Sequence, residues 1–409
     1  MITRRDLLGS SLLPVAAGLA IPAAFAKGAY AAAADRSTND RVLVILQLGG
    51  GNDGLNTLIP YTDGRYYQAR PQIGIKAPDV LRLNERVGLN PNLKGIKALW
   101  DAGKVAIVEG VGYPNPSYSH FQSVRIWEFA DPSMANVEGW LGEYLAKNFD
   151  PQGHPLGGCA LGQASVPAEL RGPTSAVTVI QSAQGFKVQG GPDRAQTAQA
   201  LYAQAPPPYG VLFDTAMTTA SHAITALTQA QSKYTPDAVY DSKQKLVYAA
   251  KNNLAQSLEL ASELISTDAG VKVVHVTLGG FDTHTIEEKR HDDLLAAVDQ
   301  AVSAFFQDLT ASGHADRVVM MSWSEFGRRV SQNGSLGTDH GAAAPMFVIG
   351  NPVKGGLYGE PPSLANLDNG NLRFTTDFRS VYRTILESYM GADASAVLST
   401  QVPTLPLLK

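Results

Sequence analysis

Carboxylate and imidazole side chains recur where strand-like apolar runs of this 409-residue sequence end or begin. Asp53 follows the first run, Asp282 and His284 follow a later one, and Asp339 with His340 stands shortly before the last. Taken singly, each has an ordinary explanation, because Asn-Asp-Gly is common turn chemistry and an aspartate often caps a helix. Their coincidence at several strand ends instead indicates a ligand site, since open α/β sheets bind ligands beyond the carboxyl ends of their strands.

Aspartate oxygens and histidine nitrogens are ligands of divalent metals, and two such metals about 4 Å apart can hold the attacking and leaving oxygens of an in-line displacement. Such a site needs a nucleophile, which is favoured at a helix N-terminus where backbone amides stabilise an anion. Ser119 stands at the start of a predicted helix that runs to Phe129, although it could simply cap that helix. We expect Ser119 to be the nucleophile and take its neighbour His120 as a second catalytic residue.

Arginine would bind a tetrahedral anion through two parallel hydrogen bonds. Arg125 lies six residues after the predicted nucleophile, and Arg328 and Arg329 follow a strand-like run. An arginine at any of these positions could equally be a solvated surface residue. We take Arg125 and Arg328 as substrate-binding candidates, together with Asn52 in the glycine-rich turn.

The elements that must position these side chains alternate between strands and helices. Short apolar runs cover residues 42–48, 105–111, 271–278, 318–323 and 346–349, with helical segments between them. This pattern predicts an α/β fold with a mostly parallel central sheet and helices on both faces. Apolar residues at helical spacing predict one amphipathic helix over residues 287–309. The Gly- and Pro-rich middle of the chain, about residues 156–265, is interpreted as an insertion or cap on this sheet.

The first 26 residues are typical of a twin-arginine export signal. Arg4-Arg5 precedes a mildly apolar run, and Ala24-Phe25-Ala26 is a small-x-small cleavage site. A membrane anchor is the alternative, but the run is shorter than a span and contains Pro14 and Pro22. We predict a signal at residues 1–26, an alanine-rich tether at 27–40 and a periplasmic α/β domain at 41–409, with no membrane span after signal removal.

Charge and cysteine content narrow the class of protein further. The formal net charge is −4, and no dense run of lysine and arginine could follow a phosphate backbone, so nucleic acid is excluded as a partner. The chain has one cysteine, Cys159, so it cannot form an intrachain disulfide. No activating base stands near Cys159 in the sequence, and we expect it to be a small buried residue.

Several long motifs carry a family resemblance. VILQLGGGNDGLNTLIPY, GGFDTH, SWSEFGRRVSQNGSLGTDHGAAAPMFVIG and LRFTTDFRSVYRTILESYMG resemble family 1501 of the domains of unknown function. That family groups exported bacterial proteins, placed by fold in the alkaline phosphatase and sulfatase superfamily. The resemblance implies a two-metal site in which Asp53 is the first ligand, Ser119 the nucleophile, Asp282 with His284 an Asp-His pair, and Asp339 with His340 a dipeptide.

Two departures from the superfamily pattern affect this site. The Asp-His pair is shorter than the usual Asp-x-x-x-His, and no histidine follows His340. His291 could supply the missing ligand only if the helix that contains it begins after His284. The sulfatase signature Cys/Ser-x-Pro-x-Arg is also absent.

The leading hypothesis is an exported hydrolase of phosphate or sulfate esters that uses a serine nucleophile and one or two divalent ions, namely zinc, manganese or calcium. Asp53, Asp339 and His340 would hold one metal, and Asp282 with His284 the second position. The substrate would be a small-molecule or polymer-linked ester. The alternative is a catalytically inactive periplasmic scaffold that binds a glycan, a surface polymer or a partner protein, which the two departures favour.

Overall fold

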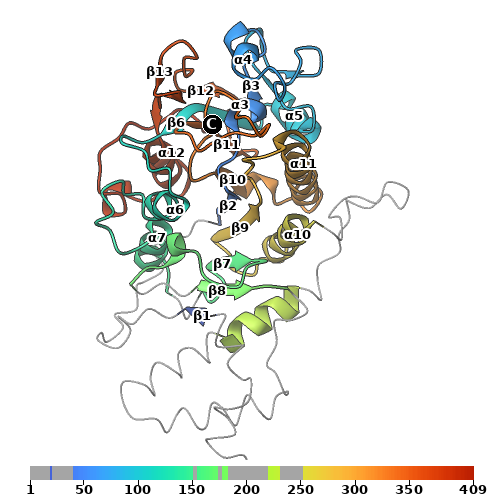
Figure 1. Ribbon diagram of the computed structural model, residues 1–409. Helices are drawn as coiled ribbons and strands as arrows, with labels where there is room; N and C mark the ends of the chain where they lie inside the picture. The colour runs from blue at the N-terminus through green and yellow to red at the C-terminus, as the bar shows by residue number, and fades with distance from the viewer. Residues whose placement is uncertain (1–18, 21–39, 151–153, 174–176, 183–219, 231–251) are drawn as a thin grey trace, which may run out of the picture.

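The computed structural model describes residues 19–20, 40–150, 154–173, 177–182, 220–230 and 252–409 (Figure 1). The predicted export signal and tether therefore lie outside the described residues, apart from β1 (Leu19–Ala20) and Asp40. Among the described residues, no helix combines the length and apolar character needed to cross a bilayer.

A 10-stranded, mostly parallel sheet forms the centre of the molecule, in the order β1-β8-β7-β9-β2-β10-β11-β6-β12, with β15 beside β6. Its strands after β1 are β2 (Val42–Gly49), β6 (Val105–Gly112), β7 (Gly158–Leu161), β8 (Val177–Ile180), β9 (Val273–Gly279), β10 (Val318–Trp323), β11 (Ala344–Ile349), β12 (Gly356–Tyr358) and β15 (Thr376–Asp377). β2 pairs in parallel with both β9 and β10, whereas β11 runs antiparallel to β10 and β6. The predicted fold class is confirmed.

Helices cover both faces of this sheet (Figure 1). Alternate residues of β2 enter different cores, with Val44 packed on one face and Ile45 on the other. One core is completed by α5 (Lys94–Asp101), α10 (Asn253–Ser266) and α11 (Glu287–Ala311), and the other by α6 (His120–Phe129), α7 (Trp140–Asn148) and α12 (Phe378–Thr384). Strands buried on both faces read as continuous apolar runs, which is why the sequence revealed them.

Smaller elements surround the sheet. They are α3 (Gly54–Thr57), α4 (Gly64–Ala69), a three-stranded sheet of β3 (Leu58–Ile59), β5 (Gly88–Leu89) and β4 (Leu81–Arg82), a hairpin of β13 (Leu367–Asp368) and β14 (Asn371–Leu372), the 3-10 turns η2 (Ala168–Leu170), η3 (Ala315–Arg317) and η5 (Ala394–Ala396), and the π-helical turn η4 (Ile385–Tyr389).

The described parts of the expected insertion belong to the central layers. β7 pairs in parallel with β9, β8 extends the sheet beyond β7, and α10 packs on α11 and β9. Within residues 156–265, positions 174–176, 183–219 and 231–251 lie outside the described residues, and a short helix at 220–230 contributes Ala223, Leu227 and Ala230 to the core that α10 and α11 complete. Cys159 on β7 is fully buried, as expected, and its thiol donates to the carbonyl oxygen of Leu156.

Strand direction and one glycine bring the chemistry-bearing loops together. Because β11 runs antiparallel, the loop that precedes it lies at the same edge of the sheet as the loops that follow β2, β6, β9 and β10. Gly50 has φ +118°, and a Cβ there would lie 2.4 Å from the backbone nitrogen of Asp282. Glycine is therefore needed at position 50 so that the turn can approach the neighbouring loop closely.

Candidate metal centre

Three histidines and one aspartate meet at this edge of the sheet. His120 opens α6 after β6, Asp282 and His284 follow β9, and His340 precedes β11. The Nε2 atoms of His284, His340 and His120 lie 3.1, 3.3 and 3.7 Å from Oδ1 of Asp282. The Nε2 atoms of His284 and His340 are 2.9 Å apart. His120, Asp282 and His340 are close enough to hold a metal ion together.

The other ring nitrogen of each histidine, Nδ1, contacts an acceptor away from this centre. The acceptors are Oε1 of Glu325 for His120 at 2.8 Å, the carbonyl oxygen of Tyr118 for His340 at 2.7 Å, and Oδ1 of Asp339 for His284 at 3.3 Å. An ionised carboxylate and a carbonyl can only accept, so Nδ1 carries the proton in each neutral ring. The Nε2 lone pairs are then left facing one another and the Asp282 carboxylate, which is the donor arrangement of a cation site.

The ionisation states of Asp282 and His340 are those in which these side chains bind metal ions. Burial alone would raise the pKa of Asp282, but the hydrogen bond and positive charge of the Arg328 guanidinium outweigh it and lower that pKa, so the carboxyl is ionised at neutral pH. Burial lowers the pKa of His340, which keeps its imidazole in the neutral form that binds metals. The Asp282 side chain is 45% exposed, so the centre is open to solvent. We call His120, Asp282, His284 and His340 the histidine centre.

Arg328 is a buried residue that contacts the histidine centre through Asp282. It is 1% exposed, and its guanidinium donates to the carbonyl oxygens of Gly50, Gly51, Phe281 and Thr338 as well as to Oδ1 of Asp282. These bonds engage its donors with three loops and with Asp282, so Arg328 joins the loops that carry the centre, and the substrate-binding role predicted for it stays a prediction. Phe326, with its ring centroid 4.4 Å from that of His340, packs beside the same imidazole.

The sequence interpretation did not include Glu325 among the site residues. This carboxylate is 2% exposed, binds Nδ1 of His120 and accepts from the backbone nitrogen of Gly50 at 2.9 Å. Its position two residues after Trp323, which ends the fourth apolar run, was the available signal. A carboxylate behind a metal-binding imidazole fixes the tautomer and raises the basicity of the ligand nitrogen.

Replacing Glu325 with glutamine is therefore expected to weaken metal binding by about 10- to 100-fold, because Gln holds the imidazole less firmly and carries no charge. Competition between the protein and a chromophoric zinc chelator measures the affinity. The matched control is Glu85→Gln, at an exposed turn position, which should leave the affinity unchanged. An unchanged affinity in Glu325→Gln would show that the His120–Glu325 contact does not serve a ligand.

Asp53 is placed differently from the prediction. It is fully buried and caps α3 through the backbone nitrogen of Leu55, and both its carboxylate oxygens contact the buried guanidinium of Arg70. Burial raises its pKa, but Arg70 reverses this and holds the pKa well below its usual range. A buried cation from the protein itself thus occupies the side of Asp53 where a metal was expected.

Other predicted residues also make contacts away from the histidine centre. Asn52 is buried and bonds Thr57, and its Oδ1 faces Nε2 of His291 at 2.9 Å. His291 lies on α11. This helix begins at Glu287, three residues after His284, so His284 is not part of it. Arg125 is exposed, contacts the carbonyl oxygen of Asn136 and lies over the Phe129 ring. Neither Asn52 nor Arg125 is positioned by these contacts to bind a substrate at the centre.

Asp339 and Ser119 remain beside the histidine centre. Oδ1 of Asp339 accepts from Nδ1 of His284 and from Nδ2 of Asn333, so Asp339 contacts the imidazole on the side away from Asp282, and its predicted role as a ligand stays a prediction. Ser119 is exposed and occupies the N-cap position of α6, but its hydroxyl makes no capping hydrogen bond. It is joined by a peptide bond to His120 on one side and to Tyr118, whose carbonyl binds His340, on the other.

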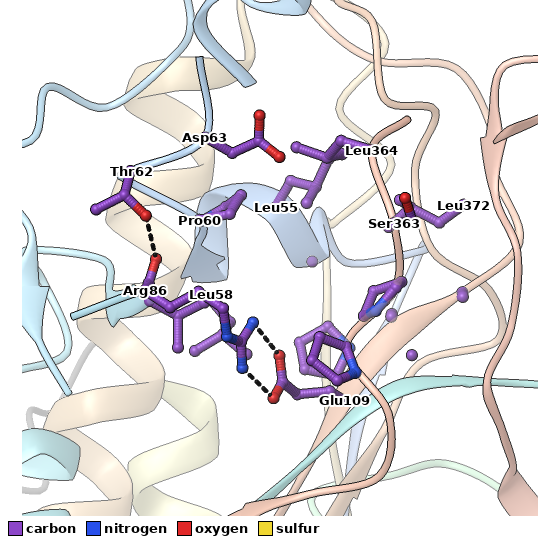
Figure 2. Close-up of a pocket in the computed structure, with 18 residues that line it drawn as sticks. Leu55, Leu58, Pro60, Thr62, Asp63, Arg86, Glu109, Ser363, Leu364 and Leu372 are labelled. Atoms are coloured by element: carbon purple, nitrogen blue, oxygen red, sulfur yellow. Dashed lines mark hydrogen bonds and ion pairs between the residues drawn. The ribbon is translucent and has the colours of Figure 1, made fainter. Parts of the chain in front are cut away.

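A separate pocket of about 160 Å³ lies where the α3 turn meets β6 (Figure 2). Leu55, Leu58 and Leu364 contribute to its apolar lining, and Arg86 donates two hydrogen bonds to the buried carboxylate of Glu109, at 2.9 and 2.6 Å. No residue of the histidine centre lines this pocket, so the two are separate features.

Comparison with known proteins places these features in context. The profile of the family described as "Protein of unknown function (DUF1501)" matches residues 108–399. No curated protein matches the chain.

Solved structures give likenesses of fold at low identity. Ps i-CgsB in complex with k-i-k-neocarrahexaose is 11% identical, with 89% of this chain and 75% of that chain covered and a TM-score of 0.41. A protein in the alkaline phosphatase superfamily from Vibrio parahaemolyticus is 10% identical, with 90% and 72% covered and a TM-score of 0.39. PsFucS1 sulfatase from Pseudoalteromonas sp. is 12% identical, with 87% and 68% covered and a TM-score of 0.35.

Proposed function

The chain belongs to the DUF1501 family of proteins of unknown function, and we propose that it is a metal-dependent hydrolase of phosphate or sulfate esters that acts in the periplasm after twin-arginine export. The observation that carries this proposal is the convergence of three imidazole Nε2 atoms on the Asp282 carboxylate at an exposed sheet edge. Imidazole nitrogens that gather around one carboxylate oxygen form a donor set of the kind that holds a divalent ion.

The donor set also narrows the choice of metal. Three nitrogens and one carboxylate suit zinc or another transition metal, whereas calcium prefers six to eight oxygen ligands. We therefore propose one zinc- or manganese-type ion per chain, held by His120, Asp282, His284 and His340. Asp53 is not among the proposed ligands because Arg70 already neutralises it. His120, first taken as a catalytic residue, becomes a ligand.

Ser119 is the proposed nucleophile. Its hydroxyl stands at the N-terminus of the ten-residue helix α6, where the backbone amides and the helix dipole favour an anion. When bound, a divalent ion would supply positive charge that lowers the pKa of a nearby hydroxyl and neutralises a phosphate or sulfate oxygen. The hydroxyl oxygen of Ser119 would bond to the phosphorus or sulfur, the ester alcohol would leave with a proton, and water would then release the acid and restore the serine.

A binding scaffold without catalysis is the second candidate function. Two guanidinium groups favour it, because Arg70 neutralises Asp53 and Arg328 donates to Asp282. Protein cations thus compensate two carboxylates of the proposed two-metal arrangement, which leaves one metal position. A scaffold of this kind would bind an anionic group of a glycan, a surface polymer or a partner protein at the remaining position and release it unchanged.

The test of the hydrolase is Ser119→Ala in the zinc- or manganese-loaded protein, with aryl phosphates and aryl sulfates as substrates. We expect turnover to fall by at least about 10³-fold, because losing the nucleophile of a covalent mechanism removes most of the rate enhancement. Metal content should stay at the wild-type level, since Ser119 is not a proposed ligand. Ser363→Ala, at an exposed position that lines the separate pocket rather than the centre, is the matched control and should retain activity. If metal-loaded wild-type protein hydrolyses neither aryl phosphates nor aryl sulfates, the hydrolase proposal fails and the binding scaffold is the function that remains.

A further inference from the structure

The pocket between the α3 turn and β6 is large enough for one ring-sized group (Figure 2). Its volume is about 160 Å³, and a cavity of about 150 Å³ lined by apolar side chains holds one benzene molecule. The lining residues come from separate stretches of the chain and fall within residues 54–63, 86–87, 109–110, 343–345, 361–364 and 372. The fold therefore builds this pocket from segments that are far apart in the sequence.

The wall of the pocket is largely apolar and does not need to be ordered by a ligand. Leu55, Leu58 and Leu364 line it and are themselves buried in the hydrophobic cores. Four prolines add rigid rings that carry no backbone N–H donor: Pro60, Pro345, Pro361 and Pro362. Because these side chains are held in place before a ligand arrives, an apolar group that enters loses little affinity to their ordering.

The charged side chains of the lining already have partners of opposite charge. Among the described residues, the charged members of the lining are Asp63, Arg86 and Glu109. Arg86 pairs with Glu109, and Asp63 pairs with Arg65 at 3.2 Å outside the lining. Glu360 stands next to the lining in the sequence, but it is exposed, so water screens its charge. A charged ligand would bring an uncompensated charge into this pocket, whereas a neutral one would not.

The Arg86–Glu109 pair also gives the pocket a hydrogen-bond acceptor (Figure 2). The Glu109 side chain is 4% exposed and that of Arg86 is 41% exposed, so the carboxylate is the enclosed member of the pair. A carboxylate has about four acceptor positions. Within the described residues, the hydrogen bonds to Glu109 come from the two terminal nitrogens of Arg86. A hydroxyl group of a ligand can therefore donate to this carboxylate without displacing Arg86.

We propose that this pocket is a second ligand site, which takes a neutral compound with an apolar group of the size of one six-membered ring and a hydroxyl group that donates to Glu109. The ring would contact the leucine and proline side chains of the wall, and the hydroxyl would lie at the Arg86–Glu109 pair. The inference is independent of the proposed hydrolase, because no residue of the histidine centre lines the pocket and the argument involves no metal.

Three compounds that share a ring and differ in charge test this proposal. Benzyl alcohol is neutral, benzylamine is a cation at pH 7 and benzoate is an anion. Their binding to the folded protein, without added metal, is measured by ligand-observed NMR titration. We expect benzyl alcohol to bind with a Kd of about 1 mM, and each charged compound to bind about tenfold more weakly or worse. Tighter binding of either charged compound to the wild type, or no binding of benzyl alcohol, would overturn the inference.

Two substitutions in the ion pair should change the charge preference in opposite directions. Glu109→Gln leaves the Arg86 guanidinium without its carboxylate, so the affinity for benzoate should rise by about tenfold. Arg86→Met leaves Glu109 without its cation, so the affinity for benzylamine should rise by a similar factor. Glu387→Gln is the matched control, because Glu387 forms an ion pair with Arg383 outside the pocket, and it should leave all three affinities unchanged.

Folding and hydrolysis are separated from pocket binding by further measurements. Glu109→Gln keeps the shape of the side chain and Arg86→Met alters a half-exposed one, so each should retain one cooperative thermal unfolding transition. Affinities that stay at wild-type values in both folded variants would place the binding elsewhere and overturn the inference. Binding of benzyl alcohol by a protein that hydrolyses no ester would retain the pocket and remove the hydrolase, and hydrolysis without such binding would do the reverse.

Discussion

Protein loaded with zinc or manganese is expected to retain about one equivalent of metal per chain, and Asp282→Ala to retain less than about a tenth of that under the same dialysis. Asp282 supplies the oxygen on which all three Nε2 atoms converge, so its removal leaves the imidazoles without the one anionic ligand. Arg328 keeps its bonds to four carbonyl oxygens in this variant, so the loops should stay in place. Metal analysis of the folded protein measures the result.

Bound metal should also stabilise the fold, which gives a second measurement. At a free metal concentration of 100 times the dissociation constant, the free energy of unfolding rises by about 2.7 kcal/mol, and a chelator should remove that increment. Asp293→Ala is the matched control, because Asp293 is an exposed carboxylate on α11 that pairs with Lys289. Full metal content and an intact chelator effect in both Asp282→Ala and His340→Ala would disprove the centre.

The sequence predicted the parts of the site that depend on strand ends. Asp282, His284 and His340 came together as expected, because β9 ends at the same edge of the sheet at which β11 begins. Apolar runs reveal buried strands, and parallel neighbours place their following loops side by side. The position of His340 also depends on the direction of β11, and the apolar run at residues 346–349 did not predict that this strand is antiparallel.

Pairing between buried charges could not be predicted in this way. The sequence shows Asp53 in a glycine turn, but not that Arg70, seventeen residues later in the chain, would bind it within the fold. His120 was expected to catalyse because it follows Ser119, and only the tertiary positions of Glu325 and Asp282 show that its Nδ1 contacts one carboxylate and its Nε2 faces the other. Such partners are set by tertiary packing, which hydrophobic periodicity does not encode.

Arg70→Met is expected to lower the free energy of unfolding at neutral pH by about 3–5 kcal/mol. Both partners of the Arg70–Asp53 pair have side chains that are 0% exposed, and Arg70 also donates to the carbonyl oxygens of Val330 and Arg329 at 2.8 and 3.0 Å. Met fills a similar volume but leaves the Asp53 carboxylate buried without its cation. Chemical denaturation followed by circular dichroism measures the change. The matched control is Arg65→Met, whose 57% exposed side chain pairs with Asp63 and should cost under about 1 kcal/mol.

The pH dependence of Arg70→Met distinguishes a lost ion pair from lost packing. In the wild type, Arg70 holds the pKa of Asp53 below its unfolded value of about 3.9, so the pair stabilises the fold above that pH and loses this contribution as pH falls further. In Arg70→Met, burial without the cation raises the same pKa, so stability should fall as pH rises above about 4. The destabilisation should thus be largest near neutral pH and shrink in acid. Glu287, whose pKa burial and the Asp53 charge raise to about 9, makes the stability of both proteins fall as pH rises above its unfolded pKa, so the test compares the difference between wild type and variant at each pH. A destabilisation that stays constant between pH 4 and 7 would mean that Arg70 acts through packing, and the interpretation of Arg70 as the cation that takes the place of a metal beside Asp53 would fail.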